Sequence, residues 1–282
     1  MNKNHQATKS FILLFILFIS TTSFGYSSGN INSSSHYSMS TNPYNLEFVV
    51  LSQEMKDRRT YKTSGQYNKL DTALTYTTGI KNDFRLFGAY VYESNRHSEN
   101  KGYFELTEIM YRRNKIFSQR NHGFSLDLEL KAYYVLDPEL RERWGFNSAI
   151  IPQLVFRKRF VPWFSLSAKV RHHFNMRRGS QPYLTKEETR VYLSPTFIFS
   201  RKFMFNTEFT WKHKNKVAKS AYYADEIDLL EVRPSLMYMF NYSVMGEIFT
   251  DTTLMRSHDK SLISKTADDE MTYGMGVYIS AF

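Results

Sequence analysis

The run Phe124-Ser-Leu-Asp-Leu-Glu-Leu-Lys-Ala-Tyr-Tyr134 alternates apolar and polar residues almost throughout. Successive side chains of a β-strand point to opposite faces, so one face of this segment is apolar. The other face carries Ser125, Asp127, Glu129 and Lys131. A helix would distribute these charges around its axis. The run therefore predicts a strand that is ionic on one side and apolar on the other.

The same alternation recurs along the chain from Leu46 onward. It is clearest in 163–175, where Phe164 and Leu166 alternate with Ser165 and Ser167. Each such segment predicts a strand by the same period of two. The predicted strands are 45–53, 67–79, 83–93, 103–112, 123–136, 145–159, 163–175, 189–199, 202–212, 227–240, 243–255 and 271–282.

The connectors between these segments alternate in length. Short connectors lie at 80–82, 160–162, 200–201 and 241–242, and long polar ones at 54–66, 94–102, 137–144, 176–188, 213–226 and 256–270. Outer-membrane barrels have an even number of strands, short turns at one end and long loops at the other. A soluble sandwich has no reason to keep this alternation. The pattern predicts an all-β fold, a transmembrane antiparallel up-and-down β-barrel of 12 strands with short periplasmic turns and long extracellular loops.

One region departs from this pattern. The connector at 113–122 is longer than a periplasmic turn, and the preceding segment, 103–112, carries Glu105 and Glu108 three residues apart. Strict alternation would place these two carboxylates on opposite faces. We therefore expect 103–112 to be the least regular strand.

Composition agrees with a barrel. Aromatic residues make up 16% of the 282 residues, yet the mean hydropathy is −0.46. Membrane-spanning helices are far more apolar, whereas a barrel strand shows lipid only at every second residue. The chain has no cysteine, which excludes disulfides, a thiol nucleophile and Cys-ligated metals. No cofactor and no metal site is predicted.

The N-terminus predicts export. Lys3 and Lys9 precede the apolar run 11–19, and Ser23-Phe24-Gly25 has the small-x-small form of a signal-peptidase site. The apolar run is too short to cross a bilayer, which takes about 20 residues. We expect a signal peptide at 1–25, a disordered periplasmic lead-in at 26–44 and the barrel over 45–282.

The chain ends on the run Tyr273-Gly-Met-Gly-Val-Tyr-Ile-Ser-Ala-Phe282. A terminal strand that closes on an aromatic resembles the bacterial outer-membrane β-barrels, whose terminal strand is read by the barrel-assembly machinery. The resemblance implies a location in the bacterial outer membrane and an assembly signal at Tyr278 and Phe282. We expect these two side chains to share the outward face of the strand.

Aromatic residues gather at the predicted strand ends, as they do in the two interfacial girdles of a barrel. Those expected at the periplasmic rim are Trp163, Phe199, Phe203, Phe240, Tyr242 and Phe282, and those expected at the outer rim are Trp144 and Trp211.

The charged faces should line the interior, because a Lys or Arg facing lipid at mid-depth costs about 2–4 kcal/mol. The basic residues predicted to line a pore are Arg157, Arg159, Lys169, Arg171, His173, Arg190, Lys212 and Arg233. The acidic ones are Asp127, Glu129, Glu208, Glu231, Glu247 and Asp251. Since the basic residues fall on five successive strands, we expect one basic wall, opposed by acids mostly on flanking strands, and a preference for anions.

Three functions fit this layout. The first is a channel for passive passage of small anionic solutes. The second is a closed barrel with a structural or adhesive role, in which the interior charges pair and plug the lumen. The third is a barrel lipid hydrolase, but Ser167 and His173 lie on one strand about 20 Å apart and cannot form a nucleophile–base pair. No catalytic residue is predicted.

The layout resembles the oligogalacturonate-specific porins, a family of monomeric outer-membrane channels. The resemblance is carried by Arg157-Lys-Arg159, Lys169-Val-Arg171-His-His173, Glu231-Val-Arg233-Pro234 and the terminal Tyr278-x-x-x-Phe282. It implies a monomeric 12-stranded channel for acidic oligosaccharides. The expected partners are outer-membrane lipid, lipopolysaccharide, the barrel-assembly machinery and small anionic solutes. Nucleic acid is not expected for an exported chain, although the net charge is +10.

Overall fold

The computed structural model describes residues 43–57, 63–78, 82–95, 101–144, 146–177, 185–216, 226–256 and 270–281. The predicted signal peptide, nearly all of the predicted lead-in and Phe282 lie outside these ranges. Within the described ranges, no helix is long and apolar enough to cross a membrane.

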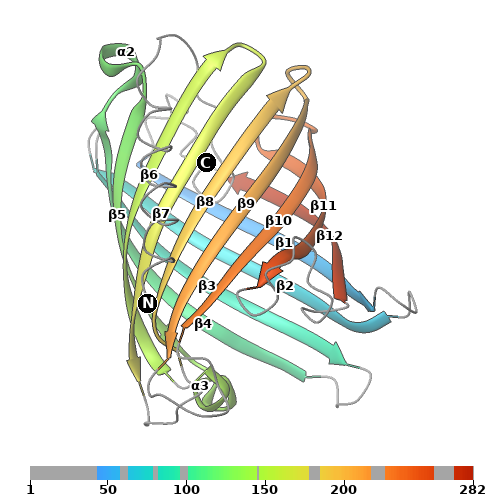
Figure 1. Ribbon diagram of the computed structural model, residues 1–282. Helices are drawn as coiled ribbons and strands as arrows, with labels where there is room; N and C mark the ends of the chain where they lie inside the picture. Colours follow the sequence, from blue (N-terminus) through green and yellow to red (C-terminus); the bar gives the residue numbers. More distant parts are fainter. Residues whose placement is uncertain are drawn as a thin grey trace, which may run out of the picture.

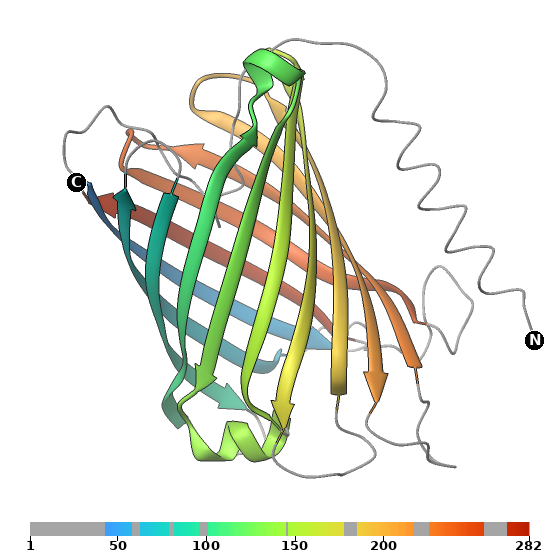
Figure 2. The ribbon, with the colours of Figure 1, turned by 90° about the vertical axis from the view of Figure 1, so that its left-hand side faces the viewer.

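Antiparallel strands form one closed barrel in which each strand pairs with its neighbours in sequence (Figure 1). The front and back walls slant in opposite directions in Figure 1, and in Figure 2 steep front strands cross shallower strands behind them, as the tilted strands of a barrel do. The predicted 12-stranded up-and-down barrel is therefore confirmed. Its strands are β1 (Tyr44–Asp57), β2 (Thr63–Thr78), β3 (Asn82–Asn95), β4 (Lys101–Phe117), β5 (Ser125–Val135), β6 (Phe146–Val161), β7 (Phe164–Arg177), β8 (Thr185–Ile198), β9 (Phe203–Lys216), β10 (Glu226–Met239), β11 (Val244–Arg256) and β12 (Glu270–Ala281).

The first and last strands close the barrel. β1 pairs with β12 over its whole length, from Leu46 opposite Ala281 to Asp57 opposite Glu270. A closed ladder leaves no edge strand with unpaired backbone groups. Closure thus brings together the two ends of a domain that spans more than 230 residues.

Apart from 118–124, the connectors alternate in length as predicted. Pro162 and Trp163 alone join β6 to β7, and residues 199–202 and 240–243 make the next two short turns. The opposite end carries the long connectors, one of which contains α3 (Pro138–Trp144). Asp137 begins this helix by accepting hydrogen bonds from the N–H groups of Glu139 and Leu140 at 2.9 and 3.0 Å.

β4 contains a bulge that resolves the ambiguity at its two glutamates. Its register against β3 shifts by one residue between the pairs Ala89–Leu106 and Tyr90–Phe104. The inserted residue, Glu105, points inward and its carboxylate lies 3.1 Å from Lys69 Nζ. Glu108 also points inward, 3.2 Å from Lys131 Nζ. A bulge reverses the alternation along one strand, so both carboxylates face the interior.

The predicted long connector at 113–122 is shorter in the structure, because β4 continues to Phe117. The one-turn helix α2 (Gln119–His122) then leads into β5 through Gly123, whose φ of 75° suits glycine. A second irregularity in β4, between Arg113 and Phe117, shifts its register against β5. There the Lys115 N–H donates to Asp127 at 2.7 Å.

The two faces of the wall differ as the alternation predicts. On β5, Leu128 and Leu130 are 40% and 49% exposed on the outside, whereas Asp127 and Glu129 are 4% and 1% exposed inside. Large exposed apolar side chains of the other strands continue this outer surface, among them Phe104, Ile109, Ile248 and Met275. An apolar belt of this extent around a barrel is the surface that lipid covers.

Aromatic residues mark the short-turn rim where they were predicted. Trp163, Phe199, Phe240 and Tyr242 are all exposed beside the short turns, and Trp163 stacks on Phe197. At the other end, Trp211 stacks on His213, and Trp144 is the last residue of α3.

The predicted outward orientation of Tyr278 is wrong. Met275, Val277 and Ile279 are the exposed residues on this part of β12, and Tyr278 points inward, where its hydroxyl donates to Glu247 at 2.5 Å. Gly274 and Gly276 share the inward face, and they make room for Phe249 and Leu51. The apolar outer face of this part of β12 is therefore formed by Met275, Val277 and Ile279. A role of Tyr278 in assembly stays a prediction.

The packing of Phe249 on Gly274 generates a stability prediction. A Cβ on Gly274 would coincide with the Phe249 ring, whereas a Cβ on Gly88 would lie 3.7 Å from Thr72 Oγ1, in ordinary contact. We expect Gly274→Ala to lower the free energy of unfolding by about 1–3 kcal/mol through overpacking, and Gly88→Ala to change it little. Urea unfolding of the detergent-folded protein, followed by tryptophan fluorescence, measures both. Equal stability of the two variants would contradict this packing.

Candidate functional site: the charged interior of the barrel

The structure places the predicted charged residues on the inward faces of their strands. Asp127, Glu129, Arg157, Lys169 and His173 are all buried there. Arg159 lies at the short-turn rim, where its guanidinium donates to the carbonyls of Val161 and Pro162. Arg159 therefore holds the turn between β6 and β7 and does not face the middle of the lumen.

The predicted separation into a basic wall and acidic flanks is wrong. Most of the predicted cations form an ion pair with an acid of the same strand, of a neighbouring strand or, for Lys169, of the next strand but one. Residues that face each other across neighbouring strands have Cβ atoms about 4.5–5.5 Å apart, so a continuous basic wall would repel itself. The pairs are Arg157–Asp127, Lys169–Glu208 at 3.6 Å, Arg190–Glu188, Lys212–Glu231 at 2.6 Å and Arg233–Glu247 at 3.1 Å.

The most deeply buried charges form a network across β3 to β6. Arg112 donates from Nε to Glu129 at 2.7 Å and lies 3.9 Å from Asp83. Gln153 donates to the second oxygen of Glu129 at 2.7 Å, and Asn114 donates to Asp83 at 2.6 Å. This network fills the adjoining part of the interior with paired charge.

Sequence reasoning missed several members of the interior. Asp83 and Arg112 belong to the buried network, and Arg85 pairs with Glu47 at 2.8 Å. On β3, both faces are largely apolar in mid-strand, and on β4 the bulge reverses the alternation. The sequence does contain a signal for Arg85. It lies between the apolar residues Phe84 and Leu86, and alternation therefore predicts that it faces inward.

Arg171 takes no part in this pairing. Its side chain forms no ion pair within the described ranges, and its guanidinium lies 4.8 Å from the ring centroid of Tyr192. Lys169 lies 4.4 Å from the same ring. Arg190 faces Arg171 directly across β7 and β8. The interior therefore carries a local excess of positive charge around Tyr192.

Polar residues on the outer face are also paired. His172 points outward, as alternation predicts, with its Nδ1 2.8 Å from Thr189 Oγ1. Between β9 and β10, His213 Nδ1 lies 2.9 Å from Asp228. Hydrogen bonding of this kind reduces the energetic cost of placing polar groups beside lipid.

The interior shows no hydrolase geometry between the residues that sequence reasoning considered. His173 Nε2 and Ser167 Oγ are buried, and each lacks a hydrogen-bond partner in the described part of the chain. A nucleophile and its base must lie within about 2.6–3.2 Å of each other. Across the same ranges, no three His, Asp or Glu side chains are grouped to hold a metal ion.

Comparison with solved structures places the fold among outer-membrane channels. The chain superposes on the NanC porin with a TM-score of 0.55 at 10% sequence identity, covering 82% of this chain and 98% of NanC. The KdgM porin gives 0.50 at 10% identity and 84% and 99% coverage. An outer membrane channel from Pseudomonas putida F1 gives 0.58 at 8% identity, with 91% and 100% coverage. The resemblance to porins of this type is thus confirmed for the fold. No protein-family model and no curated protein matches the sequence.

The buried network generates a second stability prediction. We expect Arg112→Met to lower the free energy of unfolding by about 3–5 kcal/mol, because it leaves Glu129 and Asp83 buried beside an uncharged side chain. Lys186→Met, which removes an exposed pair with Glu187, should change it by less than about 1 kcal/mol. Denaturant titration of both variants in the same detergent gives the comparison. A loss at Arg112 no larger than at Lys186 would show that the network does not stabilise the wall.

Proposed function

We propose that the protein is a monomeric channel of the bacterial outer membrane through which small solutes, including anionic ones such as acidic oligosaccharides, pass passively. In this proposal, a signal peptide directs export and the barrel-assembly machinery inserts the barrel. The short turns then lie in the periplasm. The long loops face outward, where lipid and lipopolysaccharide surround the barrel.

One observation carries the channel proposal: the barrel is closed, apolar outside and ionic inside. Barrels of about eight strands are filled by their own side chains, and the interior widens with strand number. Here the side chains of Arg190, Lys212 and Arg233 keep 25%, 19% and 29% of their surface accessible, although they point inward. Water therefore reaches charged groups on the β8–β10 wall.

The preference for anions has two supports. The pairing of most interior charges leaves Arg171 as a cation without an acid, next to Arg190 and Lys169. A guanidinium presents a planar fork that matches a carboxylate. In addition, the KdgM porin, which shares the fold, has been solved in complex with disordered oligogalacturonate.

A closed barrel with a structural role is the second candidate. It is favoured by the buried network of Asp83, Arg112 and Glu129, which packs against the β3–β6 wall so tightly that these side chains are nearly inaccessible. In this alternative, the long loops would carry the function.

Planar-bilayer recording separates the two candidates. If the barrel conducts, purified folded protein should give discrete current steps in 1 M KCl, because ions cross along the accessible β8–β10 wall. Heat-denatured protein from the same preparation is the control. Absence of steps from the folded protein would exclude the channel and leave the closed barrel.

The anion preference is tested at Arg171. We expect Arg171→Gln to shift the reversal potential in a tenfold KCl gradient toward cation preference, because within the described ranges no ion pair neutralises this charge. Arg157→Gln is the matched control. Arg157 is only 9% exposed and is bound to Asp127, so it should contribute less to the field in the lumen. Equal reversal potentials for wild type and Arg171→Gln would contradict the preference.

A further inference from the structure

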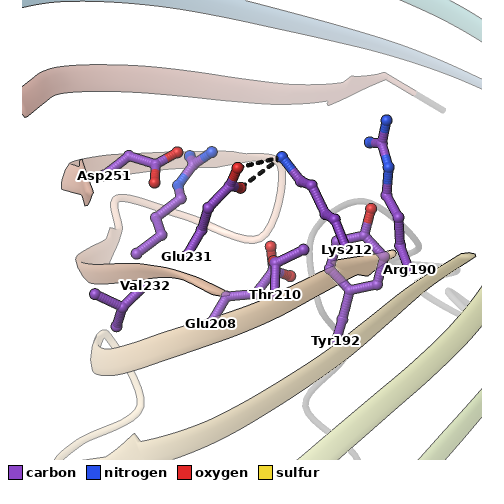
Figure 3. Close-up of a pocket in the computed structure, with 9 residues that line it drawn as sticks. Arg190, Tyr192, Glu208, Thr210, Lys212, Glu231, Val232 and Asp251 are labelled. Carbon is purple, nitrogen blue, oxygen red and sulfur yellow. Dashed lines mark hydrogen bonds and ion pairs between the residues drawn. The ribbon is translucent and has the colours of Figure 1, made fainter. Parts of the chain in front are cut away.

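A recess of about 160 Å³ opens into the lumen from the wall formed by β8, β9, β10 and β11 (Figure 3). A cavity of about 150 Å³ is large enough to hold a benzene-sized molecule. The recess therefore has room for one small solute or one end of a longer one. Its charged lining residues are Arg190, Glu208, Lys212, Glu231, Arg233 and Asp251, joined by Tyr192 and Thr210.

The charges of the recess balance in number but not in position. Arg190 lies at the β8 edge and Asp251 at the β11 edge, with the Lys212–Glu231 pair between them (Figure 3). The two central charges are 2.6 Å apart and neutralise each other. Arg190 is bound to Glu188, but Arg171 faces Arg190 across β7 and β8 and forms no ion pair within the described ranges. The β8 edge therefore keeps a net positive charge, and the β11 edge is negative.

The acid at the β11 edge is the one without a counter-charge. Asp251 forms no ion pair within the described ranges, whereas Glu208 and Glu231 lie beside Lys169 and Lys212. Arg233, the cation on the adjacent strand, is held by Glu247 at 3.1 Å and lies 3.6 Å from the Phe249 ring centroid. The carboxylate of Asp251 is therefore available for a cationic group of a solute.

We propose that this recess binds zwitterionic solutes of about dipeptide size, with the solute ammonium at Asp251 and its carboxylate at Arg190. The proposal rests on the channel function proposed above and adds a solute class that an anion preference does not cover. A solute with both charges satisfies both edges at once. An anion meets repulsion from Asp251, and a cation meets repulsion from the net positive charge of Arg171 and Arg190 beside Glu188.

The dimensions fit a short peptide. Three interstrand spacings of about 4.8 Å separate the backbones of β8 and β11, about 14 Å in all. Along the strands, Arg190 is level with Lys212, Leu229 and Arg256, and Asp251 lies five residues along β11 from Arg256. A bound solute therefore lies diagonally across the recess, and the long side chain of Arg190 spans part of the distance. Two or three extended residues span about 7–10 Å between their terminal charges. A free amino acid is too short to reach both edges.

The test compares three forms of one dipeptide. Dialanine is zwitterionic, N-acetyl-dialanine is an anion and dialanine amide is a cation at pH 7. Each is titrated against single wild-type channels, and its half-blocking concentration is measured. We expect dialanine to block at a concentration about fivefold lower than either singly charged form.

Two substitutions assign the two edges. Asp251→Asn should raise the half-blocking concentration of dialanine and of the amide about fivefold and lower that of N-acetyl-dialanine, which Asp251 no longer repels. Arg190→Gln combined with Glu188→Gln, which keeps the local charge balanced, should raise it for dialanine and N-acetyl-dialanine only. Asp228→Asn is the matched control, because Asp228 pairs with His213 on the outer face and should affect none of the three.

The outcomes are distinguishable. Absence of current from wild type overturns the channel function itself. Normal current with equal block by all three dipeptides overturns the zwitterion site alone. The zwitterion site is also overturned if neither Asp251→Asn nor the double variant Arg190→Gln, Glu188→Gln changes the half-blocking concentration of dialanine.

Discussion

The closed hydrogen-bonded ladder is the constraint on which the rest of the structure depends. In hydrocarbon each unsatisfied backbone N–H or C=O costs several kcal/mol, so a sheet can cross a membrane only if it has no edge. Here β12 returns to β1 in an unbroken register from Ala281 to Glu270. Once the sheet is closed, every strand has one face toward lipid and one toward the interior. The distribution of all other side chains follows from this division.

The interior is dominated by a second constraint, the need to neutralise charge in a confined space. Burying two like charges side by side, away from bulk water, is unfavourable. Residues that face each other on neighbouring strands are close enough for this repulsion to matter. The structure responds with ion pairs between neighbouring or diagonal residues, such as Lys212–Glu231 and Arg233–Glu247. Within the described ranges, Arg171 and Asp251 are two inward charges that take no part in these ion pairs, and the proposals on solute binding rest on them.

The seam of the barrel shows how the two constraints are combined. Arg233 lies over the Phe249 ring, and the tip of that ring occupies the space beside Gly274 that a Cβ would fill. Glu247 accepts hydrogen bonds from both Arg233 and Tyr278. Gly274 interrupts the side-chain pattern of β12, and the space left by its missing side chain holds the Phe249 ring. The Phe249 ring packs against the Arg233 guanidinium. Through Phe249 and Glu247, the interior charges of β10 and β11 contact β12 at Gly274 and Tyr278.

The sequence by itself determined the strands, their number, their up-and-down order and which faces of the regular strands are ionic. These properties follow from local alternation and connector length, and Asp127 and Glu129 on β5 lie where the pattern predicted. Only the tertiary structure decided which charges neutralise which, and that Glu105 and Glu108 both face inward. Pairing depends on interstrand register and on the bulge in β4, and one inserted residue inverts every face that follows it. Neither the register nor the bulge can be predicted from the sequence of one strand, because both depend on how that strand pairs with its neighbour.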